Sequence, residues 1–154
     1  MIDIEVEDPA WLQVAPDAAE RAREAAEAAL AGRAGDGVVI LLTDDETVRD
    51  LNIRFLGKNA PTNVLSFPAA DNPERHLGDL ALAQGVCARE AEDQGKSLAD
   101  HLRHLVIHGV LHLLGYDHGE DGEAERMEAL ERDLLAGLGA PDPYAQRDDV
   151  QHSR

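Results

Sequence analysis

Apolar and polar positions along the first third of the chain follow the periods of strands and helices. Apolar residues alternate with acidic ones at Ile2, Ile4 and Val6, which predicts a strand with one buried face and one face in water. The alanine-rich stretch PDAAERAREAAEAALAG (16–32) predicts a helix that starts at its proline and ends at its last glycine. The continuous apolar run VVILL (38–42) is typical of a short strand covered on both faces.

The middle of the chain predicts a helix followed by two strands. Thr43 and Glu46 have the spacing of a capping box, so we expect a helix to start there. This helix carries apolar residues on one side, at Val48, Leu51 and Phe55, and the stretch LGKNAPTN (56–63) ends it. NVLSFP (63–68) and LGDLALA (77–83) are strand-like runs joined by turn-forming residues, so we expect two neighbouring antiparallel strands.

Three further helices are predicted in the last part of the chain. The first covers about residues 86–94, and Ser97 caps the second with Asp100 at its third position. The third runs from about residue 121 to Gly139, with apolar residues at helical spacing at Met127, Leu130, Leu134 and Leu138. Together the elements predict one α+β domain over residues 1–144, in which about five helices pack a small mixed sheet of about four strands. Residues 145–154 are polar, and we expect a disordered tail.

Histidines line one border of the helix that Ser97 caps. His108 and His112 are one turn apart and face the same way, so two imidazoles can bind one small cation. Gly115 can adopt the left-handed conformation that ends the helix, which allows His118 to reach the same point. Three neutral nitrogen ligands with an open fourth position are the arrangement of catalytic zinc. The pattern predicts one zinc ion per chain, held by these three histidines.

The other histidines, the cysteine and the acidic residues near this segment are not predicted to be metal ligands. We expect His101 to lie on the surface, His104 to pack beside the site or orient it, and Cys87 to be a small core residue. The histidine and glycine spacing is that of metzincin proteases, but Gly109 stands where those enzymes carry a glutamate as general base. Residues 117–121 offer possible substitutes at Asp117, Glu120 and Asp121, and Asp117 could instead orient a ligand histidine.

The net charge limits the possible partners. The chain has 14 basic and 31 acidic residues, a formal charge of −17, so its long-range field repels nucleic acid and anionic membranes. A polyanion must therefore be held locally, and the nearly balanced segment 49–75 supplies the candidate cations Arg54 and Lys58. The sequence starts with acidic residues where a secretory signal needs basic ones and an apolar run, no window approaches the length of a membrane span, and there is one cysteine. We therefore expect a cytoplasmic protein with no membrane partner.

The segment HGVLHLLGYDH (108–118) resembles the signature of the YbeY endoribonucleases, and the similarity extends through PTNVLSFP (61–68), LGDLALA and ALERDLLAGLGAPDPY (129–144). This resemblance implies an α+β metalloprotein in which His108, His112 and His118 bind zinc. It also implies cleavage of single-stranded RNA, with roles in maturing the 3′ end of the small-subunit ribosomal RNA and in ribosome quality control. The expected partners are ribosomal RNA and the small ribosomal subunit or its associated proteins.

The chain departs from the family pattern at Leu56, where members usually carry an arginine implicated in RNA cleavage. The hypothesis for catalysis is a zinc-activated water that attacks the phosphodiester while Arg54 or Lys58 offsets the developing charge. Attack by the substrate's own 2′-hydroxyl is the alternative. Two other functions stay open, a non-catalytic ribosome-assembly factor with structural zinc and a metalloprotease. Stacking of RNA bases would need an aromatic residue, and the candidates are Phe55, Tyr116 and the more core-like Phe67.

Overall fold

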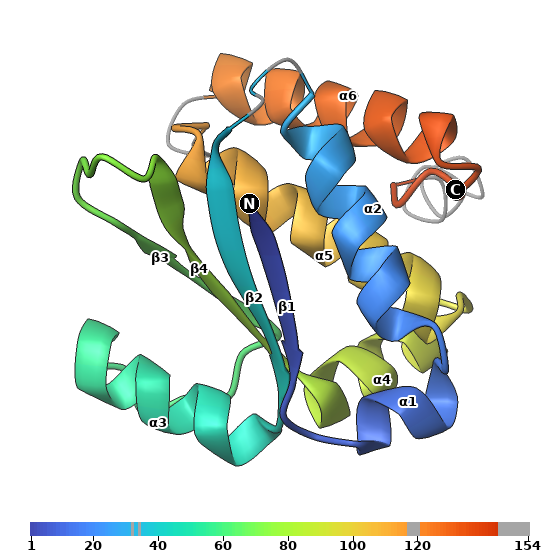
Figure 1. The fold of residues 1–154 in the computed structure, drawn as a ribbon. Coiled ribbons are helices and arrows are strands. Elements are labelled where there is room, and N and C mark those ends of the chain that lie inside the picture. The colour runs from blue at the N-terminus through green and yellow to red at the C-terminus, as the bar shows by residue number, and fades with distance from the viewer. Residues whose placement is uncertain (32, 34, 117–120, 145–154) are drawn as a thin grey trace.

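The computed structural model describes residues 1–31, 33, 35–116 and 121–144, and this part of the chain forms an α+β fold of four strands and six helices, as predicted (Figure 1). In chain order the elements are β1 (Ile2–Val6), α1 (Ala10–Val14), α2 (Ala18–Ala29), β2 (Gly37–Thr43), α3 (Asp45–Leu56), β3 (Val64–Pro68), β4 (His76–Ala83), α4 (Gln84–Asp93), α5 (Leu98–Leu113) and α6 (Asp121–Gly137). The additional helix is the short α1. None of the helices in the described residues is long and apolar enough to cross a membrane.

The sheet is mixed, with the strand order β1-β2-β4-β3. Strands β1, β2 and β4 run parallel, and the edge strand β3 is antiparallel to β4, with Ser66 opposite Leu80. This pairing confirms the predicted antiparallel neighbours. The central strand β2 is covered on both faces, as its continuous apolar sequence predicted, because Val38, Ile40 and Leu42 belong to one core cluster and Leu41 packs against the other.

The larger core lies between the sheet and the helices α2, α5 and α6, whereas α3 covers the opposite face with a smaller core (Figure 1). Helix α5 is the centre of the larger core. Nine of its sixteen residues are buried, including Leu102, Val106 and Val110. The predicted cap of α5 is confirmed, since Ser97 Oγ accepts a hydrogen bond from the backbone N–H of Asp100 at 3.1 Å. The histidine row is therefore carried by a helix that is fixed along its whole length.

Two sequence predictions about side chains are wrong. The cap of α3 is Asp44, whose carboxylate accepts from the backbone N–H of Thr47 at 2.7 Å, whereas Thr43 is the last residue of β2. His101 is not on the surface, because α4 packs against α5 and leaves this side chain only 4% exposed, with Nε2 2.8 Å from a carboxylate oxygen of Glu90.

The predicted tail at 145–154 lies outside the described residues. The alanine-rich helix starts at Ala18, two residues later than predicted.

Candidate active site

Two histidines of α5 bring their ring nitrogens together. His108 and His112 are separated by one helical turn, their ring centroids are 4.5 Å apart, and their Nε2 atoms are 3.1 Å apart. Nitrogen ligands of one tetrahedral zinc ion, each at about 2.0–2.1 Å from the metal, lie about 3.3–3.4 Å from each other. The pair is therefore already close to the separation that a shared metal ion needs.

The other ring nitrogen of each histidine faces a hydrogen-bond acceptor. Nδ1 of His112 lies 3.1 Å from the carbonyl oxygen of Tyr116, and Nδ1 of His108 lies 3.2 Å from Oε2 of Glu131. A carbonyl oxygen and an ionised carboxylate can only accept, so both Nδ1 atoms carry the proton. In the neutral rings both Nε2 atoms then present lone pairs to each other, an arrangement that a shared cation stabilises.

Glu131 of α6 is the buried acceptor that organises this row. Its side chain is fully buried, and Oε1 accepts hydrogen bonds from His104 Nε2 and from the Tyr144 hydroxyl, both at 2.7 Å. Burial by itself raises the pKa of this carboxyl, but the hydrogen bonds from His104, His108 and Tyr144 outweigh it and lower the pKa to about 2. Glu131 is therefore ionised at neutral pH and holds His108 in one tautomer.

His104 directs its Nε2 to Glu131 rather than to His112, which agrees with an orienting role. Gly115 has a φ of +104°, so the chain turns at the residue where the sequence predicted the end of the helix. The predicted third ligand His118 and the acidic residue Asp117 lie outside the described residues. Within the described residues no group of three or more His, Cys, Asp or Glu side chains is placed to hold a metal ion. The zinc ligand set His108, His112 and His118 thus stays a prediction, of which the structure brings the first two side chains together.

A cavity of about 660 Å³ opens in front of the histidine pair, between α5, the edge strand β3 and the loop after α3. Lys58 lines this cavity, and Arg54 is not among the residues that line it. Leu56, the position where the sequence resemblance implies an arginine, also lines the cavity. The geometry favours Lys58 over Arg54 as the cation beside a bound anion.

The loop that carries Lys58 is fixed to α3 by two side chains. Arg49 donates from Nε to the Asn59 side-chain oxygen at 2.7 Å, and Asn52 donates from Nδ2 to the carbonyl oxygen of Ala60 at 3.0 Å. Gly57 ends α3 with a φ of +69°, a left-handed conformation that glycine adopts without strain. These contacts hold the backbone of Lys58 at the edge of the cavity.

Gly109 has a structural explanation that argues against a protease site. An atom added as Cβ at this position would lie 2.7 Å from Cδ2 of Leu80, because α5 approaches β4 closely there. The position that holds the general base of metzincin proteases is therefore inside the interface between helix and sheet. A glutamate at that place would displace the Leu80 side chain and bury its carboxylate against the sheet.

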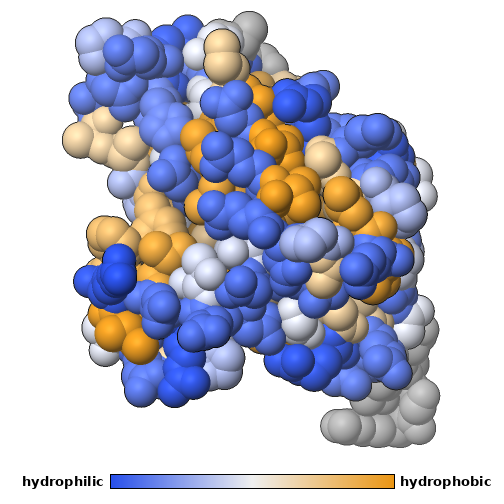
Figure 2. Space-filling model, turned by 60° about the horizontal axis from the view of Figure 1, so that its bottom comes forward, coloured by the Kyte–Doolittle hydropathy of each residue, from blue (hydrophilic) through white to orange (hydrophobic). Residues whose placement is uncertain are grey.

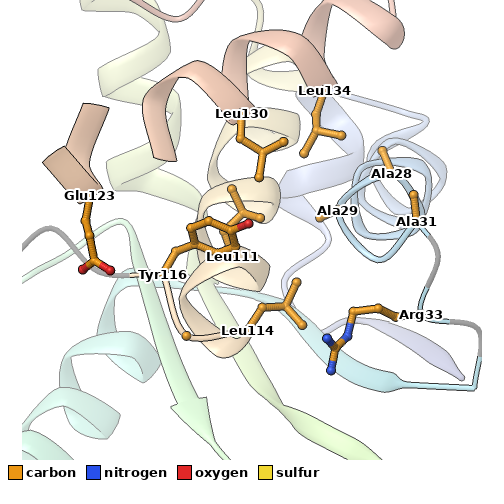
Figure 3. A pocket seen from close by; sticks show the side chains of 11 residues that line it. Ala28, Ala29, Ala31, Arg33, Leu111, Leu114, Tyr116, Glu123, Leu130 and Leu134 are labelled. Carbon is orange, nitrogen blue, oxygen red and sulfur yellow. The ribbon is translucent and has the colours of Figure 1, made fainter. Parts of the chain in front are cut away.

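The Tyr116 ring belongs to a different cavity. It lines a space of about 530 Å³ between α2, α5 and α6, together with Leu111, Leu130 and Leu134 (Figure 3). Only the backbone carbonyl of Tyr116 meets the histidine site, through His112. None of the three aromatic residues suggested by the sequence, Phe55, Phe67 and Tyr116, lines the histidine cavity, whereas Tyr144 does.

The model of a family described as Endoribonuclease YbeY matches residues 3–139. The chain belongs to this family. A protein named Endoribonuclease YbeY from Maricaulis maris is 54% identical over 96% of this chain and 93% of its own length, and its namesake from Paramagnetospirillum magneticum is 51% identical over 95% and 96%. The resemblance found in the sequence is thus confirmed.

The fold agrees with a solved structure. The solution structure of TM1509 from Thermotoga maritima superposes with a TM-score of 0.60 at 26% identity, covering 93% of this chain and 98% of that one. The α+β architecture on which the histidine pair sits is therefore found in a distant relative.

Two residues of the site were missed in the sequence. Glu131 and Tyr144 lie in the stretch 129–144 that contributed to the resemblance to the YbeY family, but no spacing connected them with His108. Glu131 meets the histidines because α6 packs against α5, and Tyr144 meets them from the segment that follows α6. The available signal was an acidic residue on the face of α6 that otherwise carries apolar residues.

Proposed function

We propose that the chain is a zinc-dependent endoribonuclease that cleaves single-stranded RNA. The observation that carries the proposal is the pair of Nε2 atoms of His108 and His112, 3.1 Å apart and beside a cavity that contains Lys58. Membership of a family described as Endoribonuclease YbeY supports RNA as the substrate. We further propose that the activity serves 3′-end maturation of small-subunit ribosomal RNA and ribosome quality control.

His108, His112 and His118 would hold the metal ion. Zinc bound there would supply Lewis acidity at a phosphoryl oxygen and lower the pKa of water. The chain's own residues do the rest of the positioning. Glu131 and the carbonyl oxygen of Tyr116 orient the two imidazoles, and Lys58 offsets negative charge that develops on the phosphate.

The acidic surface bears on how the substrate arrives. With a formal charge of −17 the chain repels a free polyanion at long range, and Lys58 supplies attraction only at short range. Bare RNA should therefore bind weakly and with a steep dependence on salt. We propose that a small ribosomal subunit or an associated protein presents the RNA in the cytoplasm.

The test is cleavage of an end-labelled single-stranded RNA by the zinc-loaded protein, beside an identically purified His112→Ala preparation. Cleavage that is lost in the variant and on chelation establishes a metal-dependent ribonuclease. Equal traces in both preparations indicate a contaminating nuclease, and they contradict the proposal if they persist when small ribosomal subunits are added. A 2′,3′-cyclic phosphate on the 5′ fragment identifies the substrate's 2′-hydroxyl as nucleophile, whereas cleavage of a fully 2′-O-methylated RNA identifies water.

Lys58→Ala and Arg54→Ala form a matched pair for the role of the cation. Both substitutions remove one exposed positive charge within five residues of each other, but only Lys58 lines the histidine cavity. We expect kcat to fall in Lys58→Ala and to change little in Arg54→Ala. Equal losses would mean that the long-range field, rather than position in the cavity, determines the effect.

Leu56 supports a second candidate function, a zinc-containing ribosome-assembly factor without catalysis. This residue lines the cavity where the family resemblance expects an arginine, so one cation is missing from the site. The second candidate predicts full metal occupancy and binding to small ribosomal subunits with no RNA turnover in their presence. Metal-dependent cleavage of any RNA would exclude it.

A further inference from the structure

A second cavity adjoins the histidine site on the other side of the edge strand β3. It has a volume of about 570 Å³ and lies between the end of α3 and strands β3 and β4. Leu56 and Ser66 line both cavities, so the two spaces meet at these residues. Figure 2 shows the face of the molecule on which α3 lies, with hydrophobic surface exposed between hydrophilic side chains.

Both phenylalanines of the chain line this second cavity. Phe55 is 65% exposed, and its ring meets Phe67 edge to face, with centroids 5.5 Å apart and an interplanar angle of 66°. The small core under α3 is formed by Val48 with residues of the sheet, and Phe55 is not part of it. An exposed aromatic ring that the core does not need, held in position by a second ring, is a surface on which a flat apolar ligand can stack.

The charges of the two cavities differ in sign. Lys58 lines the histidine cavity, and the second cavity contains the carboxylate of Asp79, whose Oδ1 is 2.8 Å from Nε2 of His76. A phosphate is attracted by the first and repelled by the second. A nucleobase carries no charge, gains from contact with the aromatic ring, and offers N–H donors to a carboxylate.

We propose that the second cavity binds the nucleobase next to the phosphate held in the histidine cavity, with the base stacked on Phe55 and walled by Leu56 and Phe67. The histidine cavity then binds the phosphate of a nucleotide, and the adjacent second cavity binds its base. This inference deepens the proposed ribonuclease function and rests on single-stranded RNA as the ligand. The surface would make cleavage depend on an unpaired base, because a base inside a duplex cannot reach Phe55.

The test is the binding of a fluorescently labelled, fully 2′-O-methylated single-stranded RNA, measured by anisotropy at low salt with the zinc-loaded protein. The 2′-O-methyl groups exclude a 2′-hydroxyl nucleophile, and a gel run after each measurement checks that water has not cleaved the RNA. Phe55→Ala should weaken binding by about 5-fold to 100-fold, the effect of losing one base–aromatic stack, and Phe55→Trp should retain it. Ile53→Ala is the matched control, since Ile53 is 43% exposed on the same helix but lines neither cavity. Its affinity should equal that of the wild type.

A second measurement identifies the base. Abasic residues are placed one at a time along the RNA, and the wild-type protein should lose affinity at a defined position. Phe55→Ala should no longer respond to the abasic substitution at that position, because the stack is already absent. Equal affinities of Phe55→Ala and wild type for every RNA would overturn the proposal.

The outcomes separate this inference from the proposed function. If metal-dependent cleavage is unaffected by Phe55→Ala and by abasic substitution, the proposed ribonuclease function is supported and the base site is refuted. If RNA binding depends on Phe55 but no RNA is cleaved, the base site is supported and the proposed catalytic function is refuted. If Phe55→Ala binds RNA normally but loses affinity for small ribosomal subunits, the cavity holds a protein side chain and the base site is wrong.

Discussion

The substitution Glu131→Gln tests whether a buried carboxylate sets the metal affinity of the histidine pair. In the wild type Oε2 of Glu131 accepts the proton of His108 Nδ1, at 3.2 Å, and Oε1 accepts from His104 and Tyr144. Glutamine has nearly the same shape but only one acceptor oxygen. With two donors already facing the Oε1 position, the amide oxygen stays there and the NH₂ group faces His108.

The amide then forces His108 to change its tautomer. Two N–H donors cannot face each other, so Nδ1 of His108 must become the acceptor and Nε2 must carry the proton. That proton occupies the lone pair directed at His112, which is 3.1 Å away. The expected loss is about 10- to 100-fold in zinc affinity, the range for substitutions of groups that orient metal ligands. Loss of the charged hydrogen bond should also reduce the free energy of unfolding by about 1.5–3 kcal/mol.

Zinc affinity is measured by competition with a chromophoric chelator, and stability by urea denaturation of the metal-free protein. Glu90→Gln is the control, because Glu90 of α4 accepts from the buried His101 of α5 at 2.8 Å and from the Asn63 amide at 3.0 Å, but it contacts neither His108 nor His112 in the described hydrogen bonds. It should lose stability without losing zinc affinity. A folded Glu131→Gln protein whose zinc affinity lies within twofold of the wild type would refute the role assigned to the carboxylate.

Three further outcomes follow from individual positions. Gly109→Glu should lower the free energy of unfolding by about 3 kcal/mol or more, because it buries a charge against the sheet; a stable variant with a normal urea midpoint would show that the helix has room there. Burial lowers the pKa of His101 below its ordinary 6.5, so its contribution to stability is full above pH 6.5 and is lost as the pH falls through the lowered value. Urea titrations between pH 7 and pH 5 should therefore show a shallower decline for His101→Gln than for the wild type, and identical slopes would contradict the assignment. Leu56→Arg should raise the rate of RNA cleavage at least about tenfold by adding a cation in the histidine cavity, whereas Ile53→Arg, with the same added charge outside it, should not; equal rate gains would point to net charge alone.

The arrangement of the sheet could be predicted because each strand had a local pattern that matched its place. The apolar run 38–42 became a central strand, and two runs joined by a turn-rich loop became antiparallel neighbours. The helix cap of α3 was predicted at the wrong residue because two neighbouring residues can both act as caps. Thr43 and Asp44 can both cap a helix, and Asp44 does so because β2 continues through Thr43, whose carbonyl oxygen accepts from the indole N–H of Trp11.

Burial by another helix was not visible in the sequence. His101 has the polar neighbours of a surface residue, but α4 folds back over this part of α5 and brings Glu90 to it. The same tertiary packing decided which cation is near the site. Arg54 and Lys58 are equivalent in the sequence. The left-handed bend at Gly57, together with the hydrogen bonds from Arg49 and Asn52 to the loop, places Lys58 at the cavity.

In the candidate site too, the residues set by local helix geometry could be predicted, and those brought in by tertiary packing could not. His108 and His112 could be predicted as a pair because four residues on a helix are always one turn apart. Glu131 is 23 residues from His108, and in a chain with 31 acidic residues its type carries no information. Its position does, since Met127 and Leu135, four residues before and after it, are both fully buried. An acidic residue on the buried stripe of a helix costs several kcal/mol unless donors meet it, so it marks the place where the donors of a functional site must lie.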